Sequence, residues 1–204
     1  MEIPKENEEK KYYTVEEYLE IQENSEEKLE FRNGEIVAMS GGTSNHSLIS
    51  TRILTALDTG IDKSNKDCMV FNSDMKVKIK DYNCFVFPDV SVVCGDAEYD
   101  NENETVLKNP ILLIEVLSKS SKNYDKGEKF EFYRSLPSFK EYMIVYQTMP
   151  KVQTWFKEAE DLWRIGNAEG LDAVIRLHSI GLEIALKDIY KRIKSFPEDV
   201  KDFY

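Results

Sequence analysis

The sequence predicts an α/β protein with a central mixed β-sheet flanked by helices, and three observations support this class. Residues 110–117 are almost continuously apolar, which is typical of a central strand buried on both faces. Residues 48–57 instead carry apolar side chains at helical spacing. Several short alternating segments surround these two, and 204 residues with 41% hydrophobic content suffice for one domain with a core.

The N-terminal part predicts a helix, a hairpin and a second helix. Thr14 followed by Glu17 fits a capping box, which predicts a helix to about Glu23. Asn33-Gly34 lies between two short alternating runs and predicts a tight β-hairpin. The helical spacing then predicts a helix over residues 44–61, with Gly60 near its end.

The rest of the chain is expected to be mainly strands. Residues 68–79 predict one long strand or a hairpin, and residues 85–93 a strand interrupted by Pro88. After the central strand at 110–117, a helix is expected from about Asp125 to Ser135, stopped by Pro137. Further strands are expected at 141–146, 152–156 and 162–165. We therefore divide the chain into three segments: a flexible acidic tail over residues 1–11, one domain over residues 12–192 and a C-terminal tail over residues 193–204.

The net charge of −11 weakens a nucleic-acid hypothesis without excluding it, because the acidity is local. Residues 1–30 hold eleven Glu and four Lys, and residues 95–104 hold five acids and no base. The remainder of the chain is close to neutral.

The apolar runs and the cysteines of the sequence indicate the cellular compartment in which the protein is expected. The longest apolar runs are too short to span a bilayer, which takes about 20 residues, and the N-terminus lacks the pattern of a signal peptide. Cys68, Cys84 and Cys94 stand at spacings that do not suit a metal site, and we interpret them as buried thiols. We therefore expect a cytoplasmic protein without a membrane partner.

Two acids stand in strongly apolar surroundings. Asp89 follows Pro88, and Glu115 lies inside the apolar run of residues 111–117. An ionised carboxylate there is costly unless a cation, hydrogen bonds or solvent compensates it. If their strands are neighbours, both acids could bind one magnesium ion, which prefers oxygen ligands and can activate water against a phosphodiester. The alternative is that each acid caps a loop or pairs with Lys or Arg.

The helix after the Glu115 strand adds a possible cation. Asp125, Lys129 and Tyr133 are four residues apart and share one helix face, which could look back at the acids after a loop that starts at Ser118. Lys129 could then stabilise negative charge or orient water. The alternative is an exposed salt bridge with Asp125.

Two further residues are ambiguous on their own. His46 lies near a helix start, where it could be a general base or a phosphate contact, or simply a cap or packing residue. Glu30 would, by charge alone, be one of many surface glutamates.

Taken in order, these motifs resemble a known family over about residues 12–190. The family is the Uma-type family of restriction endonucleases, in the PD-(D/E)XK nuclease-like superfamily. The motifs that carry the resemblance are Leu29-Glu30-Phe31, Asn33-Gly34-Glu35, Met39-Ser40, His46, Phe87-Pro88-Asp89-Val90, Ile114-Glu115-Val116-Leu117-Ser118, Asp125, Lys129, Tyr133 and Glu141-Tyr142.

The resemblance implies a restriction-endonuclease-like core with additional antiparallel strands. It implies Mg²⁺, with Mn²⁺ as an alternative, held by Asp89, Glu115 and the Val116 carbonyl. Glu30 would add a third acid and His46 would line the cleft, supported by Asp125, Tyr133 and Ser118. The sequence departs from the superfamily motif at Leu117, where a lysine is expected, and Lys129 is the inferred replacement.

Three functions remain open at this point. The first is a metal-dependent endonuclease that hydrolyses DNA, by analogy a homodimer. The second is an inactive nucleic-acid-binding descendant of the same fold. The third is a protein-interaction module that uses the acidic segments. No motif indicates a recognition sequence or separates DNA from RNA.

Overall fold

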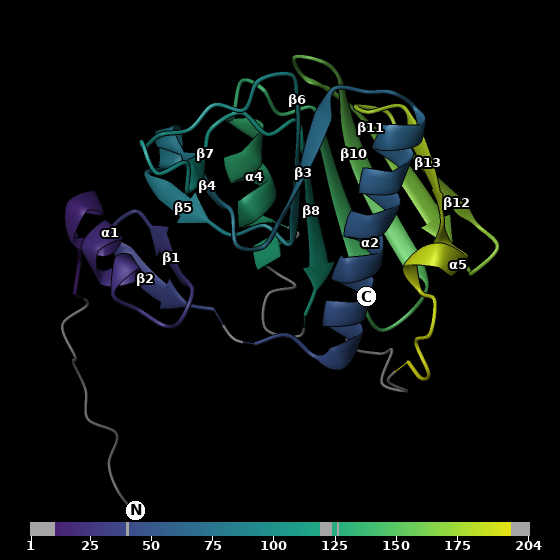
Figure 1. Cartoon of the computed structure of the whole chain (residues 1–204), viewed down its shortest axis with the longest axis horizontal. Helices are drawn as coiled ribbons and strands as arrows, with labels where there is room; N and C mark the ends of the chain where they lie inside the picture. Colours follow the sequence, from purple (N-terminus) through teal and green to yellow (C-terminus); the bar gives the residue numbers. More distant parts are fainter. Residues whose placement is uncertain (1–10, 40, 119–123, 126, 197–204) are drawn as a thin grey trace, which may run out of the picture.

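A computed structural model describes residues 11–39, 41–118, 124–125 and 127–196 of the chain (Figure 1). The described strands form a six-stranded sheet in the order β11-β10-β9-β8-β6-β3, a five-stranded sheet in the order β2-β1-β5-β4-β7, and the hairpin β12-β13. The strands are β1 (Leu29–Arg32), β2 (Glu35–Ala38), β3 (Cys68–Asn72), β4 (Lys76–Ile79), β5 (Cys84–Val86), β6 (Val90–Cys94), β7 (Val106–Leu107), β8 (Leu112–Leu117), β9 (Glu141–Tyr146), β10 (Lys151–Ala159), β11 (Leu162–Glu169), β12 (Val174–Leu177) and β13 (Leu182–Ala185). The helices are α1 (Val15–Glu23), α2 (Ser44–Lys63), the short 3-10 helix η1 (Lys80–Tyr82), α4 (Glu128–Arg134) and α5 (Leu186–Ile189).

The six-stranded sheet is mixed, and β8 lies near its centre. Strand β8 pairs in parallel with β9 and antiparallel with β6, and all six of its residues are buried. This confirms the predicted central strand and the predicted α/β class.

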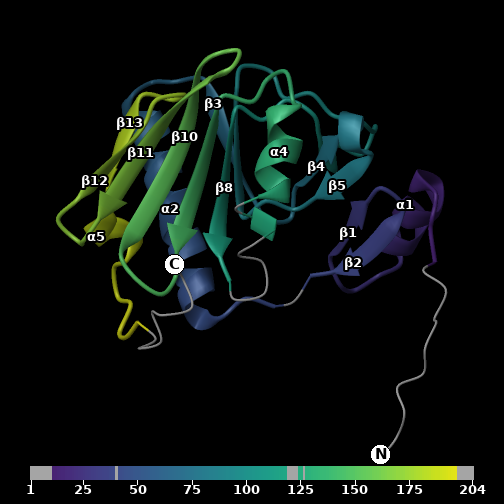
Figure 2. The same ribbon diagram turned by 180° about the vertical axis from the view of Figure 1, so that it is seen from behind.

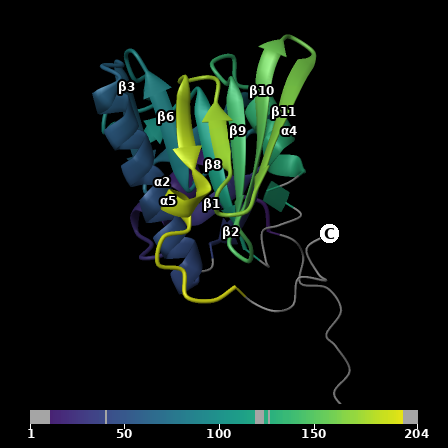
Figure 3. The same ribbon diagram turned by 90° about the vertical axis from the view of Figure 1, so that its right-hand side faces the viewer.

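Helices α2 and α4 cover opposite faces of this sheet, as Figure 3 shows. Side chains of Leu112, Ile114 and Val116 belong to the core beneath α2, while Leu113 and Leu117 pack with Tyr133 of α4. Because side chains alternate along a strand, Glu115 falls on the α4 face. The pleat of β8 therefore aims this carboxylate at the helix that carries Lys129.

The N-terminal elements form as the sequence predicts and stand at one side of the molecule (Figure 2). Thr14 N donates to Glu17 Oε2 at 2.7 Å, and Glu17 N donates to Thr14 Oγ1 at 3.2 Å, so both bonds of the capping box are present. The β1–β2 turn holds Asn33 at φ 46° and Gly34 at φ 98°, the left-handed geometry that this hairpin requires.

The prediction for residues 68–79 was wrong. Strands β3 and β4 are separate and do not pair with each other: β3 pairs with β6 in the six-stranded sheet, and β4 pairs with β5 in the five-stranded sheet. A turn at Asn72–Met75 carries the chain from one sheet to the other, where Asn72 Oδ1 accepts from Asp74 N at 2.9 Å. The alternating pattern is the same for paired and unpaired strands, so it cannot assign a partner.

The second helix is confirmed: α2 begins at Ser44 and ends at Lys63, slightly beyond the predicted end near Gly60 and Ile61. Gly60 is needed for packing rather than for termination. A Cβ at this position would lie 3.0 Å from Leu182 Cδ1, so the glycine allows strand β13 to approach the helix closely. Strands β12 and β13, strand β7, α5 and η1 were not predicted from the sequence.

The cysteine prediction was wrong for two of the three residues. Cys68 and Cys94 are opposite each other on β3 and β6 and form a disulfide, while Cys84 is buried and free. A separation of 26 residues gives no hint of this strand register. The cysteines therefore lend no support to a reducing compartment.

Within the described residues, no helix combines the length and apolarity needed to cross a membrane. The predicted tails at 1–11 and 193–204 lie largely outside the described residues, and the domain boundaries stay predictions.

Candidate active site

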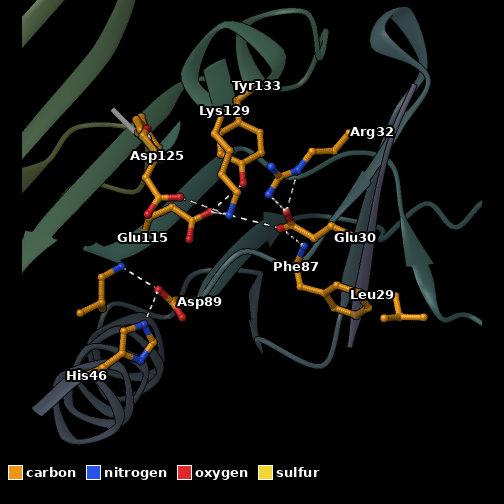
Figure 4. Close-up of polar contacts among 12 residues, drawn as sticks. Leu29, Glu30, Arg32, His46, Phe87, Asp89, Glu115, Asp125, Lys129 and Tyr133 are labelled. Atoms are coloured by element: carbon orange, nitrogen blue, oxygen red, sulfur yellow. Dashed lines mark hydrogen bonds and ion pairs between the residues drawn. The ribbon is translucent and has the colours of Figure 1, made fainter. Parts of the chain in front are cut away.

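A cleft of about 770 Å³ lies where the start of β6, the end of β8, the first turn of α2 and the β1–β2 hairpin approach α4. It brings together nearly all the residues that the sequence singled out (Figure 4). Those lining it are Glu30, His46, Asp89, Glu115, Val116, Ser118, Asp125 and Lys129. Tyr133 lies behind this surface, fully buried.

Asp89 joins the beginning of β6 to the end of β8 and to α2. Its Oδ2 accepts a hydrogen bond from Val116 N at 2.7 Å and lies 3.2 Å from His46 Nε2. Burial opposes a charge on the imidazole, but the hydrogen bond to Asp89 and the negative charges of Asp89 and Asp125 together outweigh it, so the pKa of His46 is raised. The predicted proximity of the Asp89 and Glu115 strands is therefore present.

The first turn of α2 holds His46 in place. Thr43 caps the helix, and its Oγ1 accepts from His46 N at 3.2 Å. A Cβ on Gly42 would lie 2.8 Å from His46 Nδ1, so only glycine leaves room for the ring in this position.

Glu115 is 3% exposed and is held through one oxygen. Its Oε1 lies 2.9 Å from Lys129 Nζ and accepts a hydrogen bond from Tyr133 OH at 2.7 Å. Burial raises the pKa of Glu115 well above its usual value, and the charges of Asp125 and Asp89 raise it further, although Lys129 opposes them. A cation placed beside Glu115 would favour its ionised form.

Lys129 is a buried centre of positive charge rather than half of an exposed salt bridge. Its Nζ lies 2.9 Å from Glu115 Oε1 and 3.4 Å from both Glu30 Oε1 and Asp125 Oδ1. Burial favours the neutral amine, but these three carboxylates outweigh it and raise the pKa of Lys129 well above its usual value. The ammonium reaches Glu115 from α4, which agrees with its inferred substitution for the lysine missing at Leu117.

Glu30 is 2% exposed and is therefore not a surface glutamate. Its Oε2 accepts from Arg32 Nη2 at 2.6 Å and Nε at 3.2 Å, and its Oε1 accepts from Phe87 N at 3.3 Å. Burial would raise the pKa of Glu30, but Lys129 and Arg32 outweigh it, so the pKa is lowered.

Arg32 and Tyr124 are cleft residues that the sequence analysis missed. The Arg32 guanidinium lies 3.6 Å from the centroid of the Tyr124 ring, a cation–π contact. Glu30 and Arg32 are two residues apart on β1 and so share one face of the strand. That spacing could have identified the ion pair from the sequence, whereas nothing in the sequence indicated Tyr124.

The charges of the site suit a divalent cation. Four carboxylates (Glu30, Asp89, Glu115 and Asp125) face two permanent cations, Lys129 and Arg32, which leaves an excess of negative charge when all the acids are ionised. Within the part of the chain that the structure describes, no group of three or more His, Cys, Asp or Glu side chains is arranged to hold a metal. The candidate ligand set is smaller: two carboxylates and a backbone carbonyl.

The acids have oxygens to offer such an ion. The hydrogen bonds and ion pairs of Glu115 use Oε1, and those of Asp89 use Oδ2. Oε2 of Glu115 and Oδ1 of Asp89 therefore have no partner among the described residues, and both residues line the cleft. Oxygen donors of this kind are those that Mg²⁺ and Mn²⁺ prefer, so the residues present fit the ion.

Two other predicted motif residues lie elsewhere. Glu141, at the start of β9, accepts hydrogen bonds from the backbone N–H groups of His178 and Ser179 at 3.1 and 2.9 Å. Tyr142 OH donates to the Asp125 carbonyl at 2.9 Å and so supports the wall of the cleft.

Comparison with known proteins identifies the family. Residues 15–187 match the family model Uma2, described as "Putative restriction endonuclease". The chain belongs to this family. It is 38% identical over 176 residues to one uncharacterized protein of Synechocystis sp., covering 86% of this chain and 90% of that protein. A second uncharacterized Synechocystis protein is 32% identical over 165 residues, covering 81% of this chain and 92% of its own.

A solved structure has the same fold as this Uma2 family member. It is a crystal structure described as "a putative nuclease belonging to DUF820" from Anabaena variabilis, with a TM-score of 0.70 and 18% identity over 87% of this chain and 97% of that one. The likeness supports the nuclease-like α/β fold predicted from the sequence.

Proposed function

We propose that this Uma2 family member is a metal-dependent endonuclease that hydrolyses phosphodiester bonds of DNA in the Asp89–Glu115 cleft. The observation that carries the proposal is the buried Lys129 ammonium within 3.4 Å of three carboxylates, beside the point where Asp89 bonds to Val116. Buried charge of this density is costly for stability, and such groups concentrate at functional sites.

In this proposal Asp89, Glu115 and the Val116 carbonyl would hold Mg²⁺ or Mn²⁺. When bound, the ion would supply Lewis-acid polarisation of the phosphodiester and a lowered pKa for its water. Lys129, which stays protonated, would stabilise negative charge developing on the phosphate oxygens. The Tyr133 hydroxyl and the His46 ring would act as positioning groups, because each one holds the carboxylate of an acid in place.

Glu30 and Arg32 support the same cluster from β1. The Glu30 carboxylate contacts Lys129, and Arg32 in turn holds Glu30 through two hydrogen bonds. This chain of contacts fixes the ammonium without a lysine on the Glu115 strand.

Isothermal titration with Mg²⁺ and Mn²⁺, followed by cleavage of supercoiled plasmid DNA, tests the proposal. We expect binding and cleavage by the wild-type protein, loss of both in Glu115→Gln, and retention of both in the control Glu183→Gln, an exposed strand carboxylate. Binding without cleavage of any DNA would favour the inactive nucleic-acid-binding descendant. Equal metal affinity in the wild-type protein and Glu115→Gln would remove the metal site.

We propose further that the enzyme works as a homodimer, because two active sites can cut both strands of a duplex in one binding event. The edge strand β11 is a surface that a second copy could cover, with Leu162 and Ile165 56% and 66% exposed. Light scattering after size exclusion measures the mass directly, and a monomer for both the wild-type protein and Ile165→Lys at micromolar concentration would contradict the dimer.

A further inference from the structure

The start of α2 forms a wall of the cleft that the metal and acid chemistry does not use. Thr43, Ser44 and Asn45 line the cleft, and the first N–H groups of a helix have no acceptor within the helix. His46 N is already bonded to Thr43 Oγ1, and Ser47 N to Thr43 O at 3.0 Å. The N–H groups of Ser44 and Asn45 have no hydrogen-bond partner elsewhere in the described ranges.

The same helix end carries the positive potential of the helix dipole and has no acidic residue of its own to neutralise it. Helix α2 is 20 residues long and has no acidic residue in its first turn. The aligned peptide dipoles of such a helix are equivalent to about half a positive charge at the N-terminus, which favours an anion there.

A second feature independently indicates a ligand in this part of the cleft. Thr148 lines the cleft and is 5% exposed, and its buried hydroxyl has no hydrogen-bond partner among the residues described. An unpaired buried hydroxyl destabilises the protein, and an acceptor in the cleft would remove that cost. The adjacent Gln147 accepts a hydrogen bond from Thr43 Oγ1, so Thr148 is held next to the start of α2.

The cleft therefore has two chemically different sides. Its carboxylates are Glu30, Asp89, Glu115 and Asp125, whereas the side formed by residues 43–45, 147 and 148 consists of neutral hydrogen-bonding groups. His46 links the two sides, since it belongs to the first turn of α2 and its ring contacts Asp89 (Figure 4). A polyanion is repelled by the acids without a cation, but it can be bound by the neutral side directly.

We propose that the first turn of α2, together with Thr148, is a subsite for a phosphate group of the nucleic-acid backbone. The phosphate is a neighbour of the one attacked at Asp89 and Glu115. Its oxygens accept hydrogen bonds from Ser44 N, Asn45 N and the Thr148 hydroxyl. The inference rests on the proposed nuclease function, because it assumes a nucleic-acid strand in the cleft.

A charge placed at Ser44 tests the subsite without disturbing the helix. Ser44 is exposed, and an aspartate at the start of a helix stabilises it through the dipole while repelling phosphate. Ser47→Asp is the matched control, because Ser47 is exposed, lies in the same turn and does not line the cleft. Both variants are expected to melt at or above the wild-type temperature.

Binding is measured by the fluorescence anisotropy of a labelled single-stranded DNA of 12 nucleotides. The titration is done in EDTA and again with Ca²⁺, over a range of salt concentrations. We expect Ser44→Asp to bind about fivefold to tenfold more weakly than Ser47→Asp, as for loss of one charge-assisted contact. Because the donors of the subsite are neutral and release no counterion, the weakening of Ser44→Asp relative to Ser47→Asp should persist across the salt range. Thr148→Val should weaken binding in the same direction.

The outcomes separate this inference from the proposed function. Selective weakening in Ser44→Asp, with no cleavage by the wild-type protein, would support the subsite and refute the nuclease. Cleavage by the wild-type protein, with identical binding by Ser44→Asp and Ser47→Asp at every salt concentration, would overturn the subsite and leave the nuclease intact. A wild-type protein that binds no DNA in either buffer would overturn the subsite as well.

Discussion

Tyr133 OH donates a 2.7 Å hydrogen bond to Glu115 Oε1, the same oxygen that Lys129 contacts. The helix α4 thus supplies both groups that hold this carboxylate, from positions four residues apart on one helix face. Glu115 is consequently fixed in direction, and its other oxygen remains for an ion.

Removing this hydroxyl should impair activity more than folding. Tyr133→Phe keeps the ring in its packing against Phe139 and Tyr142 but deletes the bond to Glu115. We expect a loss of stability of about 1 kcal/mol and about a tenfold fall in kcat. Tyr18→Phe is the control, because Tyr18 loses a bond to the Leu29 carbonyl but neither lines the cleft nor contacts Glu115. Equal kcat values for the two variants would show that the Glu115 bond has no positioning role.

Replacing Lys129 should destabilise the protein in a pH-dependent manner. Lys129→Met retains the apolar stem and leaves Glu115, Glu30 and Asp125 without their shared cation, which we expect to cost about 3–5 kcal/mol at neutral pH. Burial already raises the pKa of Glu115 in the folded state, and without the ammonium, which opposes this effect, the pKa rises further above its unfolded value. The variant is then most stable at low pH and loses stability as pH rises through the unfolded pKa toward the folded one.

Urea unfolding of Lys129→Met and wild-type protein at pH 5 and pH 8 measures this effect. The difference between the two proteins should be larger at pH 8, and Mg²⁺ should reduce it by partly replacing the missing charge. A difference that is the same at both pH values would mean that the three carboxylates do not depend on Lys129.

Glu30 gives the opposite pH dependence. Its pKa is lowered in the folded state, because Lys129 and Arg32 outweigh the effect of burial. Its contribution to stability is therefore present above its unfolded pKa of about 4.3 and is lost as pH falls through the lower folded value. The free energy of unfolding of wild-type protein minus that of Glu30→Gln should decrease as pH falls below about 4. A difference that stays constant from pH 7 to pH 3 would contradict the lowered pKa.

Local patterns in the sequence predicted most of the elements, because a capping box, an Asn-Gly turn and an apolar run each depend on neighbouring residues. The candidate site was predicted as a set for a related reason. Asp89 and Glu115 are identified because they are acids in apolar strands. Lys129 and Tyr133 are identified because they lie four residues apart on one face of the helix that follows the Glu115 strand.

Pairing between distant segments was not predictable in the same way. Whether β3 pairs with β4 or with β6 depends on the register of the whole sheet, and the Cys68–Cys94 disulfide follows from that register. Tyr124 was missed because its role is contact with Arg32 from another element, which no spacing along the chain encodes.

Gly42 provides a test of how closely the candidate active site depends on the start of α2. A Cβ at Gly42 would lie 2.8 Å from His46 Nδ1 and 3.1 Å from its Cγ, so Gly42→Ala must displace the ring and its contact with Asp89. At Gly41 an added Cβ would meet nothing within 4 Å, so Gly41→Ala is a control for the general effect of removing a glycine. We expect Gly42→Ala to lower kcat about fivefold to tenfold relative to Gly41→Ala, with melting temperatures of the two variants within a few degrees. Gly42→Ala is expected to act only by displacing the His46 ring. Once the ring is removed in His46→Ala, adding Gly42→Ala should therefore lower activity no further. A further loss in the double variant would place the effect of Gly42 outside the His46–Asp89 contact.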